Sequence, residues 1–339
     1  MRPIFTLALA LFSLCLQAQN TLIRAPYIQM LGSDQATIRW RSLLPGEGVI
    51  RFGTDAKQLS KFAYPNTPIA SDHSVKLSQL EPNSTYFYDV FVDGQSIGNP
   101  ELQYFTTAPR PDSRETMNFW VIGDAGTGNA SQKQVLDSYL EFSKNAPSDL
   151  TLMLGDNAYF TGLDAEYQSN LYDVYGDFYR HQPFFTIFGN HDSYSTNPLT
   201  EAGPYFNNFD VPTLGELGGV ASGTEAYYSF NYTNVHFISL DGNMIQSLLK
   251  GSAMVDWLEE DLKQNQQLWT IAMWHHPPYT KGSHDSDAED ELIYMREVVN
   301  PILEKYGVDL GLGGHSHNYE RSYVMQGHYG MSETFNPEQ

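Results

Sequence analysis

Five segments between residues 21 and 109 alternate apolar and polar side chains: ATIRWRS, GVIRFG, HSVKLSQL, STYFYDVFVDG and LQYFTTAP. A period of two residues is typical of strands that bury one face. The turn sequences PGEG, EPNS and DGQS lie between these segments, and no helical period is present. The pattern predicts an all-β sandwich over residues 21–109.

After a proline- and charge-containing linker at residues 110–116, the pattern changes to alternating strands and helices. The apolar strands are MNFWVIG, DLTLMLG, PFFTIFG, NVHFISL, LWTIAMW and VDLGLGG, and the helical segments include SQKQVLDSYLEFSKN, AMVDWLEEDLKQNQ and EDELIYMREVVNPILEKYG. Such alternation predicts an α/β domain over residues 117–339, with a largely parallel sheet covered by helices. Ligands of open α/β sheets bind beyond the carboxyl ends of the strands.

The N-terminus, MRPIFTLALALFSLCLQAQN, has one positive charge, an apolar run and a small residue at Ala18. This pattern predicts a signal peptide over residues 1–18 and a secreted or periplasmic protein, the alternative being a buried N-terminal helix. The only cysteine, Cys15, lies inside that segment, so the mature chain would have no disulfide and no thiolate metal site. No later apolar run approaches the length of a membrane span.

The net charge is −21, from 40 acidic and 19 basic residues. Such a chain offers few cations to replace the counterions of nucleic acid, so we expect no nucleic-acid binding. A small phosphorylated substrate is not excluded, because bound metal ions can invert the local field.

Oxygen and imidazole donors follow five of the six predicted strands of the α/β domain. They are Asp124; Asp156 and Tyr159; Asn190, His191 and Asp192; His275; and His315 and His317. A single such residue is more often a turn former or a helix cap. Five such strand ends on one rim favour a metal site, and residues two apart, such as His315 and His317, can face the same point.

The donor types indicate more than one metal ion. Carboxylate, amide, imidazole and phenol groups are too many for one tetrahedral zinc, and no thiolate is available. They suit two ions about 3.5–4 Å apart, as in two-metal phosphoryl hydrolases.

In order, the motifs GD, GDxxY, GNHD, a histidine after the next strand, and GHxH followed by YER resemble the purple acid phosphatases of the calcineurin-like metallophosphoesterase superfamily. The N-terminal segments APYIQMLGSDQATIRW and FTTAP resemble the fibronectin-III-like domain that precedes some of these enzymes. The resemblance implies a catalytic β-sheet sandwich flanked by helices. Gly126 stands where broader metallophosphoesterases carry a histidine, and Tyr159 is the alternative that purple acid phosphatases use.

The resemblance implies a division of the ligands between two ions. Asp124, Tyr159 and His317 would hold the first ion, Asp156 would bridge, and Asn190, His275 and His315 would hold the second. A bound phenolate favours a hard trivalent ion, Fe(III), and the second set suits Zn, Mn or Fe(II), among which the sequence does not choose.

The implied activity is that of a secreted acid phosphatase, in which a metal-bound hydroxide attacks a phosphate monoester in line. His191 is the candidate acid for the leaving group, with Asp192 as its orienting partner; the alternative for His191 is a purely supporting hydrogen bond. His284 matches a substrate-contacting histidine of plant relatives, whereas Asp285 stands where those relatives have a second histidine. We expect His276 to have a structural or supporting role.

Two other functions remain open on the sequence. The same site could cleave phosphodiesters or nucleotides, although Gly126 counts against this, or the chain could be a non-enzymatic binding module, which the complete ligand set opposes. The sequence does not indicate the physiological substrate or the oligomeric state. Family members usually continue with further strands after GHxH, so a C-terminal truncation of residues 117–339 is also an expectation.

Overall fold

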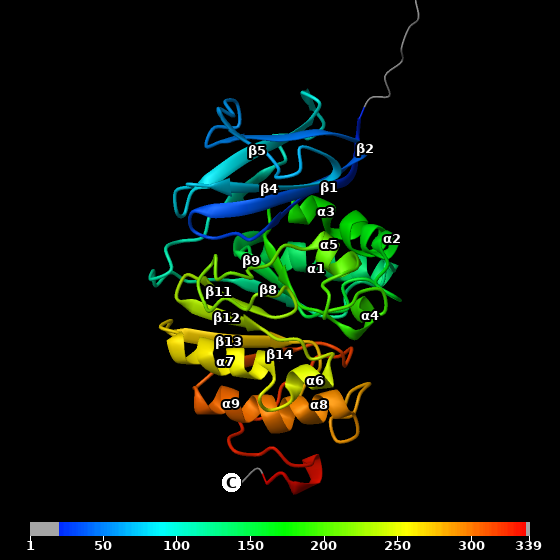
Figure 1. Ribbon diagram of the computed structural model, residues 1–339, viewed down its shortest axis with the longest axis vertical. Coiled ribbons are helices and arrows are strands. Elements are labelled where there is room, and N and C mark those ends of the chain that lie inside the picture. The colour runs from blue at the N-terminus through cyan, green and yellow to red at the C-terminus, as the bar shows by residue number, and fades with distance from the viewer. Residues whose placement is uncertain (1–19, 337–339) are drawn as a thin grey trace, which may run out of the picture.

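The computed structural model describes residues 20–336, so the predicted signal peptide at 1–18 lies outside the described residues. Figure 1 shows three zones along the long axis: an N-terminal β-sandwich, a central pair of sheets and an outer group of helices. The N-terminal strands are β1 (Leu22–Gln29), β2 (Gln35–Gly53), β3 (Lys61–Ala63), β4 (Ile69–Ser78), β5 (Thr85–Val92), β6 (Gln95–Ser96) and β7 (Tyr104–Thr106). All of their pairings are antiparallel, which confirms the all-β fold of this region.

One N-terminal strand differs from the prediction of two strands joined by a PGEG turn. β2 is a single strand of 19 residues that runs through this sequence. Its first half pairs with β1 and β4, and its second half pairs with β3 and β5. The pairing of β2 with β4 shifts register between Arg41 and Gly46, where PGEG begins. Such an irregularity bends a strand without reversing its direction, so no turn forms there. β2 therefore belongs to both halves of the sandwich.

Residues 119–313 contain two further sheets. The first has the order β10-β9-β8, from β8 (Phe119–Ile122), β9 (Leu150–Met153) and β10 (Phe184–Thr186), and the second has the order β11-β12-β13-β14, from β11 (Tyr228–Tyr232), β12 (Val235–Ser239), β13 (Trp269–Trp274) and β14 (Leu310–Gly313). Only β11 and β12 pair antiparallel. The rings of Phe185 and Phe230 stack at 3.8 Å between the two sheets. The sheets therefore face each other, as the β-sheet sandwich requires.

Helices cover the outer faces of both sheets. The elements are α1 (Ala130–Phe142), α2 (Asp164–Glu166), α3 (Asp173–Tyr179), α4 (Asn190–Ser193), α5 (Pro204–Asn208), α6 (Ile245–Leu248), α7 (Ala253–Gln264), α8 (Asp290–Tyr294) and α9 (Asn300–Lys305). The predicted continuous helix over 289–307 contains a π-helical segment, Met295–Val299, between α8 and α9. Leu258 of α7 and Ile302 of α9 pack in one apolar cluster with Trp274 of β13. In Figure 1 these helices lie along the outer side of the second sheet.

The N-terminal sandwich and the central sheets share a continuous apolar core. Ile28 and Trp40 of the sandwich belong to the same buried cluster as Leu152 and Phe185 of the first central sheet. β7 ends at Thr106 and β8 begins at Phe119, so the linker proposed at 110–116 falls between the last strand of one region and the first strand of the next. Within residues 20–336, no helix has the length and apolarity needed to cross a bilayer.

Candidate metal centre

The carboxyl ends of β8, β9, β13 and β14 meet at one edge of the paired sheets, and several residues there have left-handed backbone conformations. The φ angles are 55° at Asp124, 53° at Asp156, 70° at His315 and 50° at His317. Non-glycine residues with positive φ are uncommon, and they concentrate where the chain must aim a side chain. Each of these residues turns sharply out of its strand.

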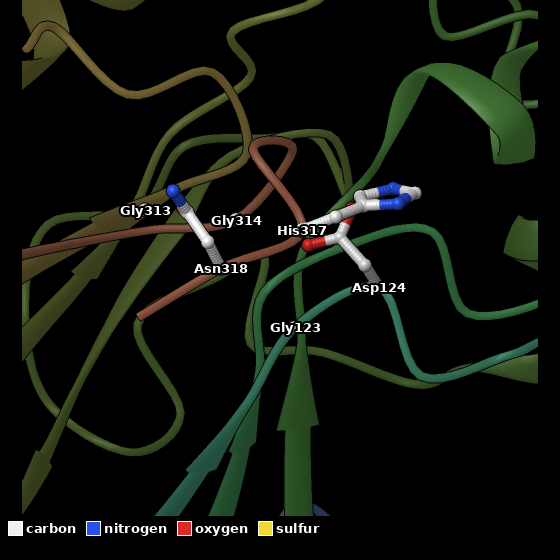
Figure 2. Close-up of a pocket in the computed structure, with 6 residues that line it drawn as sticks. All are labelled: Gly123, Asp124, Gly313, Gly314, His317 and Asn318. Carbon is white, nitrogen blue, oxygen red and sulfur yellow. The ribbon is translucent and has the colours of Figure 1, made fainter. Parts of the chain in front are cut away.

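The first group of side chains surrounds the phenol of Tyr159. Its oxygen lies 2.9 Å from a carboxylate oxygen of Asp156, 2.9 Å from Nε2 of His317 and 3.3 Å from a carboxylate oxygen of Asp124. Figure 2 shows Asp124 and His317 side by side in a cavity of about 280 Å³, which Gly123, Gly314 and Asn318 also line. The phenol, two carboxylates and one imidazole thus converge from three strand ends.

The second group surrounds the side-chain amide of Asn190. Its oxygen lies 2.9 Å from Nε2 of His275 and 3.0 Å from Nδ1 of His315. Nε2 of His275 is also 3.5 Å from a carboxylate oxygen of Asp156. Asp156 therefore lies between the two groups, and all seven residues expected to hold metal come together.

The charges of this cluster favour a bound cation. Burial and the neighbouring Asp124 and Asp156 carboxylates raise the pKa of the Tyr159 phenol far above its ordinary range. Burial alone would lower the pKa of His275, but Asp156 and Asp124 raise it to about 9. Burial alone would raise the pKa of Asp156, but His275, together with the backbone N–H and the ring of His191, lowers it. Positive charge at this point is thus strongly stabilised, and a metal ion would supply it.

Hydrogen bonds behind the cluster fix the orientation of its members. Nδ1 of His275 bonds to the carbonyl oxygen of Leu154 at 2.8 Å, which leaves Nε2 facing Asn190 and Asp156. The backbone N–H of His315 donates to Asp124 at 2.8 Å, and the backbone N–H of His191 donates to Asp156 at 2.9 Å. Such supporting bonds are typical of metal ligands because they hold the tautomer and the ring plane.

His191 lies next to the cluster, with a quarter of its side chain exposed. Its Nδ1 bonds to the carbonyl oxygen of Phe160 at 2.7 Å, and its Nε2 is 3.9 Å from a carboxylate oxygen of Asp156. A backbone carbonyl only accepts hydrogen bonds, so Nδ1 carries a proton. Nε2 is the ring atom that faces the site.

Asp192 does not orient His191, contrary to the expectation from sequence. Its fully buried carboxylate accepts hydrogen bonds from the backbone N–H of Gly189 at 2.9 Å, from Nδ2 of Asn157 at 3.0 Å and from the hydroxyl of Tyr167. Asp192 follows His191 in helix α4, where consecutive side chains point in different directions. Its hydrogen bonds therefore join the GNHD turn, residues 189–192, to the GDNAY turn, residues 155–159.

On the other side of the cluster, His284 stacks on His315 with ring centroids 3.6 Å apart. Nδ1 of His284 lies 2.9 Å from a carboxylate oxygen of Glu289, which is also 3.4 Å from Nε2 of His315. No sequence pattern singled out Glu289, because it stands in the acidic stretch AEDE at the start of α8, which is typical of a helix start. Asp285 binds the ammonium group of Lys281.

His276 is buried, as a structural histidine would be, and its ring lies 4.4 Å from that of His315. Among the histidine and carboxylate side chains of residues 20–336, three sets have ligand atoms within 4.8 Å of one another: Asp124, Asp156 and His275; His275, His276 and His315; and His284, Glu289 and His315. These sets overlap through His275 and His315. The carboxylate and imidazole donors present therefore fit two neighbouring cations.

Residues 117–319 match the family model described as calcineurin-like phosphoesterase. Curated relatives include a probable purple acid phosphatase 20 of Arabidopsis thaliana, 27% identical over 87% of this chain and 68% of its own length. Purple acid phosphatase 15 of the same plant is 28% identical over 86% of this chain and 63% of its own length, and purple acid phosphatase 1 of Ipomoea batatas is 28% identical over 77% and 54%. The chain thus spans between about half and two thirds of the length of these relatives.

Solved structures share the fold, and two of them illustrate the likeness. A purple acid phosphatase, PPD1, from yellow lupin seeds superposes with a TM-score of 0.68 at 19% identity, over 87% of this chain and 59% of that one. PhoD superposes with a TM-score of 0.59 at 15% identity, over 86% and 71%. Since the family model covers more than half of the chain and the curated relatives carry purple acid phosphatase names, this chain belongs to the calcineurin-like phosphoesterase family, among its purple acid phosphatase members.

Proposed function

We propose that this chain is a secreted, metal-dependent acid phosphatase that hydrolyses phosphate monoesters. The observation that carries the proposal is the convergence of the Tyr159 phenol on Asp124, Asp156 and His317. A phenol carries one proton, so it can donate to only one of these acceptors, whereas a cation would interact favourably with the two carboxylates, the imidazole and the phenol oxygen together. The proposed secretion rests on the signal-like residues 1–18.

Two metal ions would occupy the cluster. Asp124, Tyr159 and His317 would hold an Fe(III) ion, Asn190, His275 and His315 would hold a divalent ion (Zn, Mn or Fe(II)), and Asp156 would bridge them. When bound, such ions polarise the phosphoryl group and lower the pKa of an attacking water.

The protein's own groups would bind and protonate the substrate. His191, with its Nδ1 held by the carbonyl of Phe160, presents Nε2 as the proton donor to the leaving oxygen. His284, with its Nδ1 held by Glu289, presents its other ring nitrogen to a phosphoryl oxygen. In each histidine, Nδ1 is held by a hydrogen bond, and Nε2 would contact the substrate.

Hydrolysis of an aryl phosphate monoester and of the matching diester by the metal-loaded mature chain tests the proposal. We expect the monoester to be the better substrate. A diester rate about ten times higher would favour the phosphodiesterase or nucleotidase function that uses the same site, since this corresponds to about 1.4 kcal/mol of transition-state discrimination. No hydrolysis across a broad ester panel would favour a non-enzymatic binding module.

A further inference from the structure

The N-terminal sandwich reaches the segment that carries Tyr159. Arg41 of β2 donates to both carboxylate oxygens of Asp164, at 2.6 and 3.0 Å, and Arg24 of β1 donates to one of them at 3.2 Å. Bidentate arginine–carboxylate pairs fix direction as well as distance. In Figure 1, β1 lies directly above α3, with α2 close by.

Asp164 begins α2, five residues after Tyr159, and the intervening backbone is tied to the same short helix. The carboxylate of Glu166 accepts hydrogen bonds from the backbone N–H groups of Phe160 at 2.8 Å, Thr161 at 3.0 Å and Leu163 at 3.0 Å. The segment 159–166 is therefore a compact loop whose far end is attached to the sandwich.

The same loop also places His191, because the carbonyl oxygen of Phe160 accepts its Nδ1–H at 2.7 Å. One segment thus sets the position of the phenol at the metal cluster and of the imidazole beside it. Any change in the direction of this loop moves both groups together.

Arg24 is held in place from several sides. Its side chain is 1% exposed, it lies over the ring of Tyr172 at 3.9 Å, and it donates to Gln168 at 2.9 Å and to Asn208. Burial opposes ionisation of Asp164, yet Arg41 and Arg24 lower its pKa to about 2. Asp164 therefore stays ionised and attached over the whole range in which an acid phosphatase would work.

We infer that Arg24 and Arg41 of the N-terminal sandwich are positioning residues for the metal centre: through Asp164 they fix the loop 159–166, and with it the phenol of Tyr159 and the ring of His191. The roles of Tyr159 and His191 rest on the proposed function, but the attachment of the loop does not. The sandwich would then act on catalysis without contacting the substrate.

A second ion pair across the same interface provides a matched control. Arg39 of β2 donates to Asp210 at 3.0 Å, and Ser74 of β4 donates to the other oxygen of the same carboxylate at 2.7 Å. Asp210 follows α5 and lies outside the loop 159–166. Asp210→Asn thus weakens the contact between the two regions as Asp164→Asn does, without releasing the loop.

Amide hydrogen exchange of the full chain as isolated, read by mass spectrometry over peptides within residues 159–166, tests the attachment. We expect Asp164→Asn to raise exchange there about tenfold, the effect of losing a charge-assisted bond that closes a local segment, and Asp210→Asn to leave it unchanged. Unchanged exchange in Asp164→Asn, or an equal rise in both variants, would overturn the inference. This measurement does not depend on phosphatase activity.

Steady-state kinetics test the consequence for the site. We expect Asp164→Asn and Arg41→Lys to lower kcat about tenfold or more with a smaller change in KM, because misplacement of catalytic groups lowers the rate itself. Asp164→Glu should recover part of the loss, and Asp210→Asn should keep the kcat of the unaltered chain. Equal kcat values in all four variants would refute the positioning role, whereas an inactive unaltered chain would refute the proposed function and leave the exchange result to decide the attachment.

Discussion

The carboxylate of Asp241, just beyond β12, should make the stability of this protein fall as pH rises. The residue is 1% exposed, and its carboxylate accepts hydrogen bonds from the backbone N–H of Asn243 at 2.9 Å and from the side-chain amide of Asn243 at 3.1 Å. Burial raises its pKa from the ordinary 3.8 to about 6, in spite of the bonds from Asn243. One neutral neighbour does not replace the water that an ionised carboxylate loses on burial.

The direction of the effect follows from proton linkage. The folded protein binds the Asp241 proton more tightly than the unfolded chain does, so this group contributes no penalty below about pH 4 and an increasing penalty as pH rises to about 6. At about 1.4 kcal/mol per pKa unit, the full penalty above pH 6 is about 3 kcal/mol. Asp241→Asn keeps the shape and removes the charge, so it should stabilise the protein by up to about 3 kcal/mol at pH 7 and by little at pH 4.

Urea unfolding at pH 4, 5, 6 and 7 measures this difference directly. Asp256→Asn on α7 is the matched control, since Asp256 is an exposed carboxylate and its removal changes the net charge by the same amount. The reasoning fails if Asp241→Asn gains the same stability at pH 4 as at pH 7, or if Asp256→Asn shows the same pH-dependent gain. The first outcome would mean that packing, rather than charge, sets the effect.

Three further changes test the metal centre. Tyr159→Phe should abolish visible absorption of the iron-loaded protein while its circular dichroism stays the same, because only a phenolate bound to Fe(III) gives that band; a variant that keeps the colour would contradict the assignment of Tyr159. Glu289→Gln should weaken divalent-metal binding about 10- to 100-fold in a chelator competition, since it removes the carboxylate facing Nε2 of His315, and unchanged affinity would contradict a supporting role. His191→Gln should lower kcat for alkyl phosphates by about 10²–10⁴ and much less for p-nitrophenyl phosphate, whose leaving group needs no proton; equal losses on both substrates would exclude His191 as the acid.

The apolar runs of residues 117–339 were enough to locate the strands of the α/β domain and the rim of donors. The apolar runs before Asp124, Asp156, Asn190, His275 and His315 are short and continuous, which predicts buried parallel strands, and the residues that follow them fall at one edge of the sheets. The strand before His315, β14, is parallel as predicted but mostly exposed, because it is the last strand of its sheet in the described residues. Topology thus groups the strand ends, whereas the selection of seven donors as metal ligands is what the resemblance to purple acid phosphatases implies. The signal peptide remains a prediction from sequence.

Local patterns failed where a distant partner decides the conformation. PGEG has the residues of a turn, yet β2 continues through it because four other strands pair along its length. Asp192 follows a candidate catalytic histidine, yet it points to Asn157, 35 positions away, because α4 turns it inward. Glu289 looks like an ordinary helix-start residue until folding brings His315 beside it.

The sequence by itself determined which elements form and which donor types gather at the strand ends, because side-chain period and strand direction are local properties of the chain. Only the tertiary structure decided which atoms face one another: the phenol of Tyr159 against His317, or Arg41 against Asp164, 123 positions away. Such contacts depend on left-handed turns and on the packing of the sandwich against the central sheets. These depend on the whole fold at once, so no single segment encodes them.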